Sequence, residues 1–172
     1  QIDHKYVESF IGAYIENNEV TIITNRNGIP LSHYFTQHSN KSDFSFNPGD
    51  PTILAFKIAQ AMSYLHSRRI IHRNLDSSNI FIQHDDSPNH EIYPMIVGFR
   101  ESRFQKDGSS YSYTTKNVQR NENSSFFAPE HLDNHTYDEK VDVFSYSGIL
   151  YELLTDSAPF VTNSDTDTEN LI

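Results

Sequence analysis

Cysteine is absent from the 172 residues of this chain. Its absence excludes disulfide bonds, thiolate metal sites and a cysteine nucleophile. Basic residues are few: 13 Lys and Arg stand against 23 Asp and Glu, so the formal net charge is -10. Such a charge disfavours nucleic-acid phosphates and anionic membrane surfaces as partners. No apolar run approaches the roughly 20 residues that span a bilayer, and we expect a cytoplasmic protein without a membrane span.

The first 30 residues are typical of a β-hairpin followed by a connecting segment. Residues 10–15 and 20–24 are short apolar runs, and the polar residues 16–19 separate them. Residues 25–30 contain Asn, Gly and Pro, which indicate a connection rather than a strand.

Two helices are expected further along the chain. Asp50 offers a capping side chain, and Pro51 stands at the first helical position. The segment to residue 67 then places four apolar residues at helical spacing: Leu54, Ile58, Met62 and Leu65. Residues 141–154 are apolar on most faces, as in a buried helix.

The remaining segments predict two strands and one long loop. Residues 80–82 and 95–97 are short strand-like runs. Residues 101–125 are polar and lack periodicity, and loops of this length are usually functional or disordered.

Residues 72–79 carry the most specific pattern in the chain, His-Arg-Asn-Leu-Asp-Ser-Ser-Asn. It resembles the catalytic loop of protein kinases, His-Arg-Asp-Leu-x-x-x-Asn. In that loop the Asp accepts the proton of the attacking hydroxyl, and the final Asn holds a magnesium ion. Here Asn74 stands at the position of the Asp, and an amide cannot serve as that base.

Further segments resemble protein kinases in the same order along the chain. Residues 58–67 are similar to the helix before the catalytic loop, and Gly98-Phe99-Arg100 stands in the place of the Asp-Phe-Gly motif. Residues 128–130 are the Ala-Pro-Glu motif, and residues 140–148 resemble the Asp-Val-Trp-Ser-Phe-Gly region. The serine pair before Asn79 is similar to that of the tyrosine-kinase-like group of Ser/Thr kinases.

This resemblance implies an α+β, protein-kinase-like fold with a mostly helical large lobe and a remnant of the small-lobe β-sheet. Residues 1–24 would be the end of the small lobe, 25–30 the hinge and 31–172 most of the large lobe. The resemblance also implies a nucleotide site with Thr24 as gatekeeper and Asn25, Arg26 and Asn27 in the hinge. A complete domain of this family would have a glycine-rich loop, a strand lysine and a helix glutamate before residue 1, and further helices after residue 172.

The positions that match the family are mainly those that pack or position the backbone. His72 and Phe99 resemble the two aromatic links of the internal spine. Asp142 resembles the buried carboxylate that accepts hydrogen bonds from catalytic-loop amides. Pro129 and Glu130 resemble the anchor at the end of the long loop.

The positions that carry charge to the reaction differ from the family. Asn74 replaces the base, Asp76 the loop lysine, Gly98 the magnesium-binding carboxylate, and Asn123 a Thr that contacts the base. Asn79 alone remains at a metal-ligand position. Loss of a general base costs about 10²–10⁴ in rate, and one neutral amide holds magnesium poorly. We therefore expect no metal and no cofactor, with ATP binding doubtful, and no efficient kinase activity.

The resemblance therefore implies a pseudokinase: a signalling scaffold or allosteric binding module whose partner is a protein, such as another kinase or signalling protein. One alternative is an ATP-dependent Ser/Thr kinase that becomes active when the rest of the domain is supplied. Another is a kinase gene fragment without function. A third keeps enzymatic activity with Asp76 as a displaced base.

Three smaller questions stay open at this point. Arg100 could grip nucleotide phosphates without metal, or it could pair with Asp76 and fill the cleft. Arg73 could dock a phosphorylated segment within residues 109–115, or that segment could stay unmodified. His131 and His135 have the spacing of helical zinc ligands, but we expect structural or solvent roles because no third ligand is evident.

Overall fold

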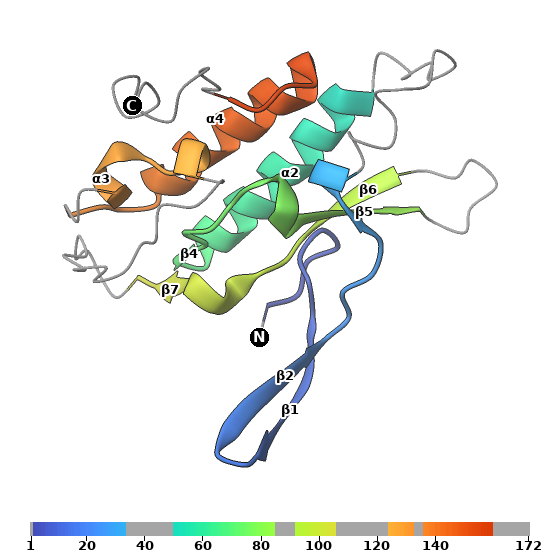
Figure 1. Cartoon of the computed structure of the whole chain (residues 1–172), viewed down its shortest axis with the longest axis vertical. Coiled ribbons are helices and arrows are strands. Elements are labelled where there is room, and N and C mark those ends of the chain that lie inside the picture. Colours follow the sequence, from blue (N-terminus) through green and yellow to red (C-terminus); the bar gives the residue numbers. More distant parts are fainter. Residues whose placement is uncertain (1, 34–49, 85–91, 106–123, 133–135, 160–172) are drawn as a thin grey trace. The chain divides into compact units, whose positions relative to one another are not determined.

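The computed structural model describes residues 2–33, 50–84, 92–105, 124–132 and 136–159 (Figure 1). The chain divides into two compact units. Unit one comprises Gln1–Ala61 and Ser78–Val97, and unit two comprises Met62–Ser77 and Gly98–Ile172. The α+β composition agrees with the predicted fold class, whereas the proposed lobe boundaries stay predictions.

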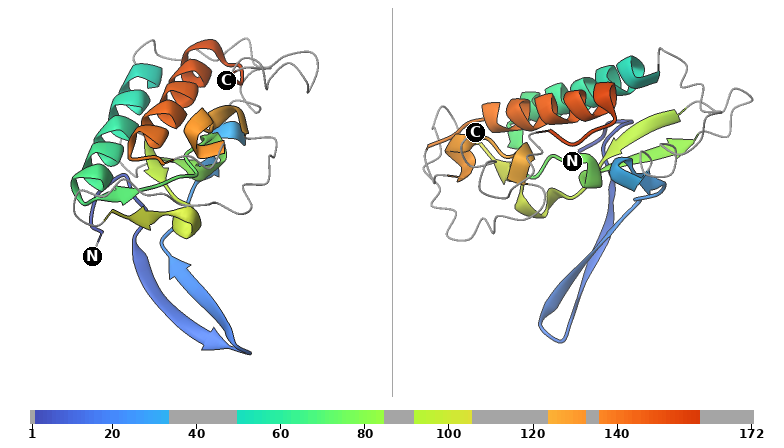
Figure 2. Two further views of the ribbon diagram at one scale, coloured as in Figure 1. Left: turned by 90° about the vertical axis from the view of Figure 1, so that its left-hand side faces the viewer. Right: turned by 45° about the horizontal axis from the view of Figure 1, so that its top comes forward.

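The predicted hairpin at the start of unit one is confirmed. Strand β1 (Phe10–Glu16) pairs antiparallel with β2 (Glu19–Thr24), and the two form a separate sheet of long strands (Figure 2). Asn17 and Asn18 close the turn with φ of 49° and 66°. Asn tolerates this left-handed conformation, which matches the twist of the adjoining strands.

A second sheet in unit one has the order β3–β5–β6. Its strands are β3 (Ile29–Pro30), β5 (Ile80–His84) and β6 (Ile92–Ile96), all paired antiparallel. The prediction that residues 25–30 form only a connection is therefore wrong for Ile29 and Pro30, which form strand β3. Gly28, with φ of 92°, brings the chain so close to β5 that a Cβ there would collide with the Ile82 carbonyl oxygen.

Strand β6 also begins earlier than the predicted run over 95–97. Pro94 pairs with Ile82, although proline reads as a strand breaker in a sequence. The position is tolerated because β6 lies at the edge of its sheet, where a missing N–H removes no ladder bond. On its other side, residue Val7 forms an isolated parallel bridge with Ile96.

Helix α2 (Asp50–Ser67) confirms the helix predicted from apolar spacing. The four residues that set the spacing are all buried: Leu54, Ile58, Met62 and Leu65. Ile53 and Phe56 lie on the exposed side of the same helix.

Unit two is built around helix α4 (Lys140–Thr155), which confirms the second predicted helix. Unit two also contains the short helix α3 (Pro129–Leu132), the paired strands β4 (Ile70–Ile71) and β7 (Arg103–Phe104), and two 3-10 turns, η2 (Phe99–Glu101) and η3 (Ser124–Phe126). A third 3-10 turn, η1 (Ser77–Asn79), begins at the last residue of the first segment of unit two and continues into unit one. A buried cluster joins these elements: Ile71, Ala128, Tyr137 and Val141, with Phe144 packed against it.

Two sequence expectations are modified in unit two. Helix α4 is not buried on most faces, because Val143, Tyr151 and Leu154 remain exposed. The long loop expected over 101–125 contains strand β7 and most of η3, and its residues 106–123 lie outside the described residues.

Candidate functional site

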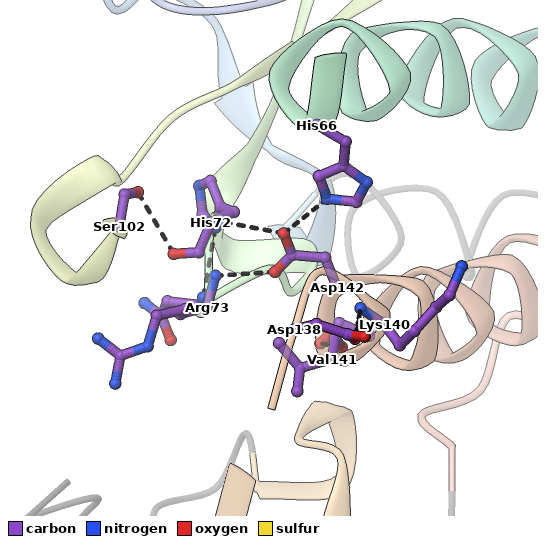
Figure 3. A network of polar contacts seen from close by, with 10 residues as sticks. His66, His72, Arg73, Ser102, Asp138, Lys140, Val141 and Asp142 are labelled. Atoms are coloured by element: carbon purple, nitrogen blue, oxygen red, sulfur yellow. Dashed lines mark hydrogen bonds and ion pairs between the residues drawn. The ribbon is translucent and has the colours of Figure 1, made fainter. Parts of the chain in front are cut away.

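Asp142, in the first turn of α4, holds the start of the segment 72–79 (Figure 3). Its side chain is fully buried, and its two oxygens accept hydrogen bonds from the backbone N–H groups of His72 and Arg73, each at 2.8 Å. Its Oδ2 also lies 2.9 Å from Nε2 of His66 at the end of α2. The prediction that Asp142 accepts hydrogen bonds from these amides is confirmed.

Because each oxygen of the Asp142 carboxylate accepts from a different backbone N–H group, these contacts fix the backbone at the start of the loop. A carboxylate that accepts several hydrogen bonds binds them more strongly than a neutral acceptor does. When His66 carries a proton, its contact with Asp142 is an ion pair as well. Removing the carboxylate would leave two buried N–H groups without an acceptor, which costs far more than an exposed hydrogen bond.

His72 orders the backbone around it through its ring and its carbonyl. The His72 and Phe99 rings meet edge to face with centroids 4.9 Å apart, as expected for the pair of aromatic links. The His72 ring Nδ1 accepts from the Asn74 N–H at 3.3 Å, and the His72 carbonyl accepts from the Ser102 hydroxyl at 3.3 Å. One residue therefore joins segment 72–79 to the segment around η2.

Arg73 adopts a left-handed backbone with φ of 69°, which costs energy for a residue with a Cβ. Its buried guanidinium donates to the Glu101 carbonyl at 2.9 Å and lies over the Tyr137 ring at 5.4 Å. Burial lowers the pKa of Arg73 from its ordinary value, whereas Tyr137 acts to raise it. Arg73 Nε has no hydrogen-bond partner within the described part of the chain. The segment 109–115 that was expected to dock here lies outside the described residues.

His131 packs in the same region as Arg73. Its ring contacts the rings of Phe127 and Tyr137, with centroids 5.4 and 5.3 Å away. Burial, reinforced by the Arg73 charge, lowers the pKa of His131 to about 4, so the ring is neutral near pH 7. The contacts give His131 a packing role, and His135 lies outside the described residues.

Asn74 and Asp76 differ sharply in what surrounds them. Asn74 is half-buried and carries no carboxylate at the position expected for a base. Asp76 is 1% exposed, so its carboxylate is buried. A lysine at this position in the family would carry the opposite charge.

Sequence reasoning did not single out Glu152 as a functional residue. This carboxyl, on the buried side of α4, accepts a hydrogen bond from the Ser77 hydroxyl at 3.1 Å. Burial, reinforced by the negative charges of Asp76 and Asp156, raises the pKa of Glu152 to about 7, although the hydrogen bond from Ser77 acts in the opposite direction. The available signal was a carboxylate between apolar residues in the second half of α4, but its partner stands 75 residues away in the sequence.

The pairing of Arg100 with Asp76 considered from the sequence is wrong. The Arg100 side chain is 94% exposed, and its Nε lies 3.8 Å from Glu101 Oε1. Asp76 is buried, so the two charges do not meet. Gly98, which precedes Arg100, has φ of 85°, a left-handed conformation that favours glycine.

The remaining predicted nucleotide-site residues belong to unit one. Asn25 Oδ1 accepts from the Ser9 N–H at 2.6 Å, and Thr24 ends β2. The Arg26 guanidinium lies over the Phe81 ring at 5.2 Å.

Asn27 and Asn79 contribute to the β3–β5–β6 sheet region. The Asn27 carbonyl accepts from Gln83 Nε2 at 3.0 Å, and the Asn79 carbonyl accepts from the Val97 N–H at 3.0 Å. These residues lie in unit one, whereas Asn74, Asp76, Gly98 and Arg100 lie in unit two. Their joint role in binding a nucleotide stays a prediction, and Asn123 lies outside the described residues.

Comparisons of the sequence with known proteins find protein kinases. Residues 1–172 match the family model described as protein kinase domain. Serine/threonine-protein kinase STY17 of Arabidopsis thaliana is 29% identical over 163 residues, which are 93% of this chain and 25% of that protein. Serine/threonine-protein kinase TNNI3K of Rattus norvegicus is 32% identical over 163 residues, 93% of this chain and 18% of that protein. The chain therefore spans a quarter or less of the length of these two relatives. Within the described residues, no helix is long and apolar enough to cross a membrane.

Proposed function

Since the chain belongs to the protein kinase family, we propose that it is a kinase-like module that does not transfer phosphate efficiently and acts by binding another protein. The observation that carries this proposal is the Asp142 network. It holds His72 and Arg73 as a working loop would need, yet the next residue is Asn74. The loop frame is kept while the group that accepts the proton is missing.

The chemistry lost at this site supports the proposal. Without a general base, the rate falls by about 10²–10⁴, or roughly 3–5 kcal/mol of barrier. Phosphoryl transfer also needs metal ions to neutralise the phosphates, and Gly98 has no side chain to coordinate one. Asp76 does not rescue the reaction in this proposal, because its carboxylate is buried.

A phosphotransfer assay tests the inactive part of the proposal. The whole chain is incubated with labelled ATP, magnesium and a general protein substrate, beside an Asp142→Asn variant in which the loop frame is broken. We expect both proteins to give the same background incorporation. Incorporation by the wild type that Asp142→Asn abolishes would contradict the proposal. If Asp76→Ala also abolished it, the displaced-base alternative would be correct.

A nucleotide-binding measurement separates the module from the alternative of a kinase that lacks only the rest of its domain. The kept Asn79 is the observation that favours this second candidate. We expect no thermal shift with ATP that depends on magnesium. A shift that needs magnesium and disappears in Asn79→Ala would favour the second candidate.

Exposed apolar side chains on the β1–β2 hairpin support a protein as the partner. They include Phe10, Ile11, Ile15, Val20 and Ile22, and large apolar surfaces of this kind commonly bind other proteins. Ile15 and Val20 face each other across the two strands. We expect Ile15→Asp combined with Val20→Asp to remove binding of a signalling partner and to leave the stability of the chain nearly unchanged. Thr21→Asp, on an equally exposed neighbour, is the control. A large loss of stability would instead show that another part of the same protein covers the hairpin.

A further inference from the structure

A carboxyl group of helix α4, that of Glu152, holds Ser77 near the end of segment 72–79. The Ser77 hydroxyl donates to Glu152 Oε1 at 3.1 Å, and both side chains are buried. Glu152 Oε2 is also buried and has no hydrogen-bond partner among the described residues. This is an unusual arrangement, because buried polar atoms are normally paired.

The surroundings of Glu152 are acidic. Asp76, from the same segment as Ser77, is 1% exposed, and Asp156 ends α4 one turn after Glu152. The groups that act on the Glu152 carboxyl are these two carboxylates and the Ser77 hydroxyl, and none of them is basic. No ion pair within the described residues involves Glu152. A buried carboxyl next to other negative charges favours its protonated form.

We propose that Glu152 is a protonation switch at the end of segment 72–79: when its proton leaves for solvent, the carboxylate binds the Ser77 hydroxyl more strongly and repels Asp76, so the backbone at the end of the segment changes conformation. The switch does not depend on whether the chain transfers phosphate. It concerns the geometry of the loop end, where Asp76 has replaced the lysine that the family resemblance leads one to expect.

The physical cause is the change in buried charge. With the proton on, Glu152 is neutral, and its contact with Ser77 needs no counter-ion. With the proton off, a buried carboxylate faces the charges of Asp76 and Asp156, and its remaining oxygen still lacks a donor. Burial raises the pKa of this carboxyl to about 7, which places the change within the physiological range. The start of the segment is unaffected, because Asp142 holds it separately.

A direct titration tests the switch. In whole chain labelled with ¹³C at the Glu side-chain carboxyl, the Glu152 signal is assigned as the one missing from Glu152→Gln. We expect its chemical shift to change with a midpoint near pH 7, and the backbone amide signals of residues 77–79 to change with the same midpoint. In Glu152→Gln the amide changes disappear. Glu139→Gln, the same substitution at the other end of α4, keeps them.

Two further variants keep the test decisive if the glutamine variant does not fold. Asp76→Asn removes a negative charge and lowers the midpoint, whereas Ser77→Ala removes a donor that stabilises the carboxylate and raises it. A Glu152 midpoint below pH 5 in the wild type would overturn the proposal. So would amide changes that persist in Glu152→Gln, or midpoints that do not move in opposite directions in these two variants.

Discussion

The two ends of segment 72–79 are held by carboxylates of the same helix in different ways. Asp142, in the first turn of α4, accepts two backbone hydrogen bonds and contacts His66, so both its oxygens are used. Glu152, near the end of α4, accepts one bond from Ser77, and its second oxygen has no partner in the described part of the chain. The start of the segment therefore has a permanent anchor, whereas its end has one that depends on protonation.

The two anchors also differ in how closely the residues around them match the kinase pattern. Around the permanent anchor, His72, Phe99 and Asp142 are the residues that the family resemblance leads one to expect. Around the conditional anchor, Asp76 brings a negative charge where a lysine is expected. A positive group there would have favoured an ionised Glu152, but Asp76 disfavours it.

Breaking the permanent anchor should have the largest effect. Asp142→Asn keeps the shape of the side chain but replaces one carboxylate oxygen by an N–H₂ group. One of the backbone N–H groups of His72 and Arg73 then faces a donor and loses its acceptor. We predict a loss of about 3 kcal/mol in the free energy of unfolding, since buried polar groups are left unpaired. Urea unfolding at pH 7 measures this loss. Glu139→Gln, at the residue immediately before α4, is the control. A loss below about 1 kcal/mol would mean that Asp142 does not anchor the loop.

The conditional anchor should make stability depend on pH. In the unfolded chain Glu152 ionises near its ordinary value of 4.5, whereas the folded carboxyl keeps its proton to about pH 7. The folded state then binds more protons in this window, so the contribution of Glu152 to stability is complete below pH 4.5 and falls as the pH rises to 7. We predict that the wild type loses about 1–3 kcal/mol relative to Glu152→Gln over this range, measured by urea unfolding.

His131 should give the opposite dependence from the same unit. Its pKa is about 4 in the folded chain and 6.5 ordinarily, so its contribution is complete above pH 6.5 and falls as the pH drops to 4. Relative to His131→Leu, the wild type should lose about 1–3 kcal/mol between pH 6.5 and 4. Because the two contributions oppose each other between pH 4.5 and 6.5, each single variant should reveal a slope that the wild type hides. Equal slopes in both variants would contradict the assignment of these two groups.

The sequence predicted the permanent anchor but not the conditional one. Asp142 could be placed because it occupies a known position in an ordered series of motifs. The contact of Ser77 with Glu152 joins residues 75 positions apart, and it depends on which face of α4 is turned toward the loop. The pairing of Arg100 with Asp76 failed for a related reason: sequence gives the charges but not the direction of each side chain. Helix α2 and the β1–β2 hairpin were predictable, because local periodicity and turn residues determine them.

Weakening the serine contact alone should have the smallest effect. Ser77→Ala removes one hydrogen bond to a neutral carboxyl, so we predict a loss of about 1 kcal/mol at pH 5. Ser145→Ala is the matched comparison, since its hydroxyl donates to the Phe126 carbonyl at 2.7 Å in the same unit. At pH 8, where Glu152 is ionised and accepts this hydrogen bond more strongly, the loss for Ser77→Ala should grow while that for Ser145→Ala stays constant. A loss that is equal at both pH values would show that the Ser77 contact does not depend on protonation.

Native-state hydrogen exchange at the His72 and Arg73 amides tests most directly whether a kinase-like frame is formed around Asn74. Both N–H groups are bound to buried Asp142 at 2.8 Å. We therefore expect both amides to exchange as slowly as the buried amides of helix α4, that is, only through global unfolding. Protection at this level, in a protein without phosphotransfer, is the result we predict. Rapid exchange at both amides would contradict it, because the loop would then not be held and the chain would be a kinase fragment without an ordered site.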